Sequence, residues 1–134
     1  LDYDNDGDLD IIVNNYHDDA TLLENETSAN NSWIKIKLIG SPEAKINRDA
    51  IGSSLILNSE NHKNMWREIH STTGYLSVHP KVQHFGLGTD MKVDITVKWS
   101  NGEVFTLKNI DTKQSYQITY PSLFICLVLS EAQL

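Results

Sequence analysis

The strongest chemical signal in the sequence is a run of alternating aspartates, Asp2-Tyr3-Asp4-Asn5-Asp6-Gly7-Asp8-Leu9-Asp10. Carboxylates at every second position can curl around one hard cation, and Gly7 supplies the backbone freedom for a sharp turn. Calcium takes about 6–8 oxygen ligands in a flexible shell, whereas magnesium demands a tight octahedron and keeps its waters. The sequence therefore predicts a calcium site. Its predicted residues are Asp2, Asp4, Asp6, Asp8 and Asp10.

The spacing also predicts how the loop would surround the ion. We expect side-chain oxygens from four aspartates and the backbone carbonyl of Asp8 between them. Since carboxylates this close repel each other, we expect the loop without a cation to be frayed. The simpler alternative is a solvated acidic turn. The four expected side-chain ligands are Asp2, Asp4, Asp6 and Asp10.

Two other readings of the acidic run fit it less well. Counting Asp2 as position 1, position 12 is Val13, where an EF-hand needs a bidentate Glu, so Asp10 must close the shell instead. A magnesium-dependent phosphotransferase could use Asp2 and Asp4 in a D-x-D-x-[TV] motif. The fifth residue of that motif is Asp6 here, not Thr or Val.

The net charge of −7 is distributed unevenly. Residues 1–26 contain nine acidic residues and no Lys or Arg, so the remainder, with nine acids and eleven bases, sums to +2. Those bases are scattered singly, which argues against a nucleic-acid partner. The single cysteine, Cys126, excludes an internal disulfide framework and a Cys-rich zinc site. The longest apolar run, Leu123–Leu129, has seven residues, short of the roughly 20 that span a bilayer, so we expect no membrane span.

Hydrophobic residues alternate with polar ones along much of the chain, which predicts β-strands and little helix. The clearest alternation covers 34–38, 93–99 and 116–120, with shorter candidates at 10–14, 21–24, 54–57, 66–70 and 82–85. Asn101-Gly102 predicts a type I′ turn, so 93–99 and 104–107 should form a hairpin. Many short strands separated by turns predict an all-β fold, a β-sandwich or a barrel-like domain.

Composition divides the chain into three parts. The polar stretch Ser28–Ser32 reads as a linker, and the head before it, 1–27, is too short to bury a core alone. We expect one β domain over 28–120 and an atypical apolar C-terminal tail over 121–134. That tail could be an extra strand or an interface, and we expect self-association through the edge of the partial blade or through this tail.

The acidic loop, D-x-D-x-D-G-x-x-D running into a strand, resembles the calcium loop of FG-GAP/VCBS repeats, the integrin-α-type propeller blade. The body resembles the ASPIC/UnbV domain, which follows such repeats. The resemblance rests on six segments in order, namely Asn47–Ser53, Leu55–Leu57, Arg67–Ile69, Gly74–Ser77, His84–Gly88 and Val97–Gly102.

The resemblance implies a non-enzymatic, calcium-binding module of a larger adhesion- or scaffold-type protein, placed outside the cell, at the cell surface or in the periplasm. Its partners would be calcium and a protein or glycan at the cell surface. The alternative is a carbohydrate-binding or enzyme-associated accessory module in which the calcium loop is structural. An exposed Trp66, Trp99 or Tyr75 would favour that alternative, although we expect Trp33, Trp66 and Trp99 to be core or half-buried. The five histidines lack metal-site spacing, and we expect His70 and His84, which lie on predicted strands, to be ordinary packing residues.

Overall fold

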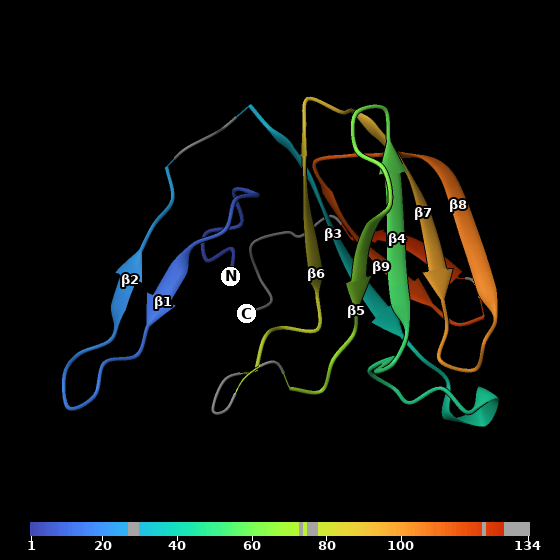
Figure 1. Cartoon of the computed structure of the whole chain (residues 1–134), viewed down its shortest axis with the longest axis horizontal. Helices are drawn as coiled ribbons and strands as arrows, with labels where there is room; N and C mark the ends of the chain where they lie inside the picture. Colours follow the sequence, from blue (N-terminus) through green and yellow to red (C-terminus); the bar gives the residue numbers. More distant parts are fainter. Residues whose placement is uncertain (27–29, 73, 75–77, 122, 128–134) are drawn as a thin grey trace.

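The computed structural model describes residues 1–26, 30–72, 74, 78–121 and 123–127. These residues form ten β-strands in three sheets and one short 3-10 helix, η1 (Pro42–Ala44), and no α-helix occurs among them. The predicted all-β class is therefore confirmed. Figure 1 shows two four-stranded sheets packed together, with a two-stranded hairpin standing apart from them.

The first four-stranded sheet has the strand order β10-β9-β3-β6. β3 and β9 run parallel, whereas the pairs β3–β6 and β9–β10 are antiparallel. The alternation that predicted β3 holds, because Ile34, Ile36 and Leu38 are buried on the inner face of the sheet. The strands are β3 (Ser32–Ile39), β6 (Gln83–Gly88), β9 (Gln114–Thr119) and β10 (Leu123–Leu127).

The second four-stranded sheet has the order β5-β4-β7-β8, and all its pairs are antiparallel. Buried residues of both sheets, among them Leu57, Phe85 and Ile95, form one core cluster. Since neither sheet closes on itself within the described residues, the domain is a sandwich rather than a barrel. The strands are β4 (Ser54–Ser59), β5 (Met65–Glu68), β7 (Lys92–Lys98) and β8 (Val104–Asp111).

The predicted hairpin of β7 and β8 is confirmed, but its predicted turn type is wrong. A type I′ turn needs positive φ at both central residues. Gly102 has φ +94°, while Asn101 keeps an ordinary negative φ. The Gly102 N–H donates to Trp99 O at 2.9 Å, and the Trp99 N–H donates to Glu103 O at 2.8 Å. These bonds define a three-residue loop in which glycine takes the left-handed position after a type I turn.

The tryptophan prediction holds for two residues and fails for the third. Trp99 is buried and Trp33 is half-buried. Trp66 is 52% exposed, because β5 is an edge strand and Trp66 lies with Ile56 on the outer face of its sheet. Tyr75, the other candidate for an exposed ring, lies outside the described residues.

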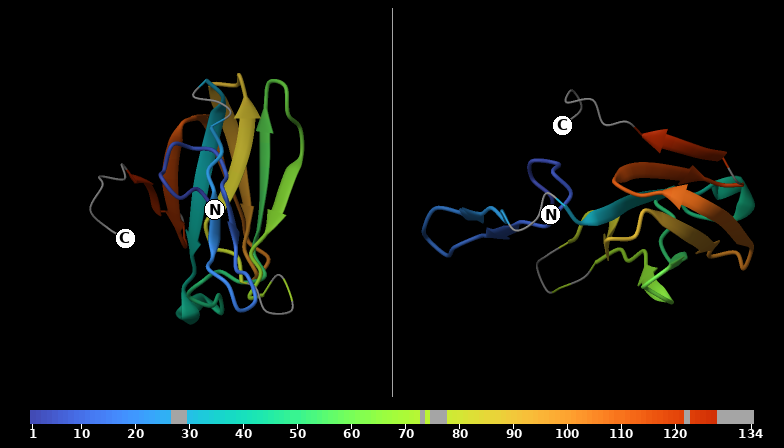
Figure 2. Two further views of the ribbon diagram at one scale, coloured as in Figure 1. Left: turned by 90° about the vertical axis from the view of Figure 1, so that its left-hand side faces the viewer. Right: turned by 90° about the horizontal axis from the view of Figure 1, so that it is seen from above.

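The predicted strands at 10–14 and 21–24 form a separate antiparallel hairpin of β1 (Ile11–Val13) and β2 (Thr21–Leu23). It projects sideways from the sandwich in the right-hand view of Figure 2. Its apolar side chains are exposed on both faces, with Ile11 at 59% and Ile12 at 50%. Two strands alone bury little apolar surface, so this hairpin adds little to the core.

The apolar tail was predicted to be an extra strand or an interface. It contains a strand, β10, over Leu123–Leu127. Parts of some predicted features lie outside the described residues. They are 28–29 of the linker, 75–77 of the segment Gly74–Ser77 that resembles the ASPIC/UnbV domain, and 128–134 of the tail. No helix in the described part of the chain is long and apolar enough to cross a membrane.

Candidate metal site

The acidic loop, residues 2–10, lies against the outer face of the β10-β9-β3-β6 sheet. Since Ile34 and Ile36 point inward, Trp33 and Lys35 of β3 point outward, and His84 of β6 pairs directly with Lys35. These three side chains make the surface on which the loop rests. Figure 2 shows the loop beside the start of β3.

Three of the predicted ligands converge. Asp2, Asp4 and Asp10 each place one carboxylate oxygen within 4.8 Å of the others. Oxygens that share one calcium ion at roughly 2.3–2.6 Å lie no farther apart than about 5 Å, so this spacing fits a common cation. The loop therefore brings together residues eight positions apart in the sequence.

Asp10 fastens the end of the loop. Its buried carboxylate accepts the N–H of Tyr3 at 2.6 Å and the N–H of Asn25 at 3.0 Å. These two backbone donors hold the pKa of Asp10 below its ordinary value, since they favour the ionised form. The Asp10 N–H in turn donates to Leu1 O at 2.6 Å, which closes the loop.

The carboxylate of Asp2 is buried, and its two oxygens have different surroundings. Its side chain is only 4% exposed, and Oδ2 pairs with Lys35 Nζ and accepts the Gly7 N–H at 3.1 Å. Oδ1 of the same carboxylate is buried without a hydrogen-bond partner among the described residues. A buried charged oxygen without a partner is costly, and a cation bound to this carboxylate would supply that partner.

Asp6 and Asp8 lie outside this group of three. Asp6 is exposed, and its Oδ1 accepts the Asp8 N–H at 2.9 Å. Both carboxylate oxygens of Asp8 are buried, and neither has a hydrogen-bond partner in the part of the chain that the structure describes. Burial first, and then repulsion from neighbouring aspartates such as Asp6, raises the pKa of Asp8. The predicted ligand roles of the Asp6 side chain and the Asp8 carbonyl remain predictions.

The structure adds three residues that sequence reasoning did not assign to the loop. Lys35 pairs with Asp2 and lies 3.4 Å from Asn5 Oδ1, so a positive charge holds the loop against the sheet. The expected fraying of the loop without a cation stays a prediction. His84, expected to be an ordinary packing residue, places Nε2 2.8 Å from Gly7 O, which accepts the hydrogen bond. The rings of Trp33 and His84 stack with centroids 6.4 Å apart.

No local sequence signal could have revealed these contacts. Lys35 is 33 residues from Asp2 and His84 is 77 residues from Gly7. A lysine that alternates with buried isoleucines usually reads as a solvated position on the outer face of a strand. Its burial, at 7% exposure, follows only from the loop that covers it.

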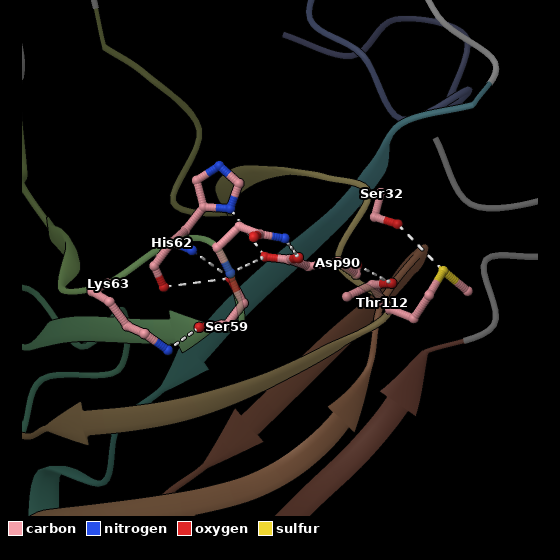
Figure 3. Close-up of polar contacts among 8 residues, drawn as sticks. Ser32, Ser59, His62, Lys63, Asp90 and Thr112 are labelled. Atoms are coloured by element: carbon pink, nitrogen blue, oxygen red, sulfur yellow. Dashed lines mark hydrogen bonds and ion pairs between the residues drawn. The ribbon is translucent and has the colours of Figure 1, made fainter.

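A second polar cluster, around Asp90, braces the sandwich (Figure 3). Buried Asp90 accepts the N–H of Asn61 at 3.1 Å and lies 3.1 Å from His62 Nδ1. Bonds from the hydroxyl of Ser59, from His62 and from Asn61 hold the pKa of Asp90 well below its ordinary value. The Thr112 hydroxyl donates to Asp90 O at 3.1 Å. The cluster joins the β4–β5 turn to the β6–β7 turn.

Comparison with known proteins identifies the body. A family model described as "ASPIC and UnbV" matches residues 43–123, more than half of the chain. The chain belongs to the ASPIC and UnbV family. The matched segment begins in η1 and ends at the first residue of β10, so it contains strands from both sheets of the sandwich.

The chain is also similar to cartilage acidic protein 1 from three vertebrates. Identity is 30% over 108 residues with the Xenopus tropicalis protein, covering 78% of this chain and 16% of that protein. It is 27% over 126 residues with the Homo sapiens protein, covering 90% and 18%, and 26% over 125 residues with the Mus musculus protein, covering 90% and 19%. The chain thus spans less than a fifth of the length of these relatives.

Proposed function

We propose that the chain is a non-enzymatic, calcium-binding β module of the ASPIC/UnbV family. One observation carries this: Asp2, Asp4 and Asp10 converge, and Asp2 keeps a buried carboxylate oxygen with no protein donor. An all-oxygen donor set held by a flexible loop suits calcium better than magnesium or a transition metal. Bound calcium would fix the loop on the sandwich.

Calcium titration of the whole chain tests this proposal. Extracellular calcium modules bind with Kd of about 10⁻⁴–10⁻³ M, so we expect heat of binding in that range by isothermal titration calorimetry. At 10 mM calcium and a Kd of about 1 mM, binding would stabilise the folded state by about 1.4 kcal/mol. The melting temperature should therefore rise in calcium relative to chelator and change little in magnesium. Identical melting curves in calcium and chelator would contradict the proposal.

We propose further that the module belongs to a larger adhesion- or scaffold-type protein, extracellular, at the cell surface or periplasmic, in which the acidic loop ends an FG-GAP/VCBS repeat. The exposed hairpin supports this. Ile11 and Leu23 lie on one face and Ile12 and Leu22 on the other, so both faces are apolar. Strands that are apolar on both faces are typical of sheets covered on both sides. A protein or glycan at the cell surface would be the partner.

A carbohydrate-binding module is the second candidate, and the exposure of Trp66 favours it. On the outer face of the second sheet, Trp66 pairs with Ile56, which pairs with Thr96. The Thr96 hydroxyl lies 3.2 Å from that of Thr106 on the next strand. An exposed aromatic ring on the same sheet face as hydroxyl groups is a suitable surface for a sugar.

Glycan-array binding by the wild-type chain and by Trp66→Ala tests the second candidate. We expect the substitution to abolish any glycan signal, while Met91→Ala, which removes another large exposed apolar side chain, leaves it intact. Absence of glycan binding by the wild type, or equal binding by Trp66→Ala, would remove this candidate.

A further inference from the structure

Lys35 occupies an unusual position for a lysine. It lies within β3, a strand paired on both sides, and its side chain points to the outer face of the sheet. It is nevertheless 7% exposed, because the acidic loop covers it. Lys37, on the same face two residues along β3, is solvent-exposed. Lysines are almost never this buried unless a partner compensates their charge.

The partners of Lys35 are all on the loop or beside it. Its Nζ pairs with Asp2 Oδ2, lies 3.4 Å from Asn5 Oδ1 and stands 5.1 Å from the centroid of the Trp33 ring. Among the ion pairs between described residues, the Lys35–Asp2 pair is the one that reaches the acidic loop. The ammonium group therefore neutralises part of the charge of five neighbouring aspartates.

The two oxygens of Asp2 have different surroundings. Oδ2 faces Lys35, while Oδ1 is the buried oxygen with no partner. A divalent cation bound to Oδ1 would lie across one carboxylate from the Lys35 ammonium, and two positive charges so close repel each other. Lys35 thus stabilises the loop without metal and opposes the metal in the same place.

We propose that Lys35 is a built-in counter-cation of the calcium site, which holds the loop on β3 without metal and keeps the affinity for calcium low. This rests on the proposed function. The proposal makes Lys35 the cause of the weak calcium affinity that suits a site responding to millimolar calcium. A merely structural role gives the opposite expectation, because losing an anchor of the loop would weaken calcium binding.

Calorimetric titration of the whole chain with CaCl₂ tests the proposal, using Lys35→Met, Lys35→Gln and the exposed control Lys37→Met. We expect the two Lys35 variants to bind calcium about tenfold more tightly than the wild type, and the control to match the wild type within about twofold. In chelator the Lys35 variants should melt at lower temperature, because the loop has lost its counter-charge. Lys35→Gln keeps a hydrogen-bond donor for Asp2. If the circular dichroism spectrum shows that Lys35→Met does not fold, Lys35→Gln is compared with the wild type instead.

The outcomes separate this inference from the calcium proposal. Wild type and Lys35 variants that bind equally, or variants that bind more weakly, overturn the role of Lys35 and leave the calcium site standing. Binding by the Lys35 variants alone contradicts the calcium proposal for the wild-type chain and supports the opposition of Lys35 to calcium, because the lysine would then suppress binding completely. No binding by any of the chains overturns both.

Discussion

Gly7 lies against the indole ring of Trp33 so closely that a Cβ built on Gly7 would stand 1.7 Å from Trp33 Nε1. Its φ is +100°, a conformation that residues with a side chain rarely adopt. Gly7 O also accepts the hydrogen bond from His84. The glycine in the middle of the acidic loop therefore serves two purposes, the sharp turn and the close approach to the sandwich.

Gly7→Ala should lift the loop from Trp33 and weaken calcium binding by about tenfold or more, since Asp2 would lose the Gly7 N–H that orients its carboxylate. Titration calorimetry measures this. Gly102→Ala is the matched control, because Gly102 has φ +94° but no atom within 4 Å of an added Cβ. It should cost about 1 kcal/mol in stability from strain alone and leave calcium affinity unchanged. Equal affinities for the two variants would argue against the docking role of Gly7.

Asp4→Asn should reduce calcium affinity with little effect on the fold. Asp4 is exposed, and among the described residues its carboxylate accepts only the Asp6 N–H, at 3.2 Å, within the loop itself. Removing one charged ligand should weaken binding by about tenfold or more. Asp49→Asn, an exposed aspartate of the sandwich, is the control for net charge. If both variants titrate like the wild type, Asp4 is not a ligand.

The exposed hairpin should make the chain associate. With Ile12 and Leu22 on one face and Ile11 and Leu23 on the other, the hairpin presents apolar surface on both sides and two free strand edges. We expect sedimentation velocity to show concentration-dependent association of the wild type, abolished in the double variant Ile12→Ser, Leu22→Ser. A monomeric wild type at high concentration would show that the hairpin needs no cover.

Local patterns predicted the strands but not their neighbours. The alternation at Ile34, Ile36 and Leu38 located β3, since a half-buried strand requires that period. Nothing in the sequence indicated that β3 pairs with β9 in parallel, because that pairing depends on a crossover of more than seventy residues. Trp66 was misassigned for the same reason: whether a strand lies at an edge is a property of the whole sheet.

In the candidate site too, local sequence predicted some features, and others depend on tertiary packing. The spacing of the aspartates predicted the convergence of Asp2, Asp4 and Asp10, because a glycine-centred loop can bring alternate residues to one point. The charge beneath the loop was not predictable, since Lys35 meets Asp2 only through tertiary packing. The sequence places no basic residue in 1–26 and so predicted compensation by a cation, whereas the fold also brings Lys35 against Asp2.

The stability of the sandwich should depend on its core and not on its exposed aromatic. Phe85 is 1% exposed within the core cluster, so Phe85→Ala should destabilise the fold by about 3–5 kcal/mol in urea unfolding. Trp66→Ala, a change of similar size at an exposed position, should stay within about 0.5 kcal/mol. Comparable losses in the two variants would mean that Trp66 is covered in solution.

The Asp90 cluster should make the fold sensitive to acid. Hydrogen bonds from Ser59, His62 and Asn61 hold the pKa of Asp90 well below its ordinary value. A group whose pKa is lower in the folded state stabilises the fold fully above its unfolded pKa, about 3.9 for Asp, and loses that contribution as the pH falls through its own lower pKa. The melting temperature of the wild type should therefore fall steeply below about pH 4. Asp90→Asn should melt lower at pH 7 and show a shallower fall, because no carboxylate remains to be protonated there.

Asp111→Asn, which removes an exposed carboxylate paired with Lys92, is the control and should follow the wild-type profile. If wild type and Asp90→Asn have parallel profiles from pH 7 to pH 3, Asp90 is not a source of the acid sensitivity.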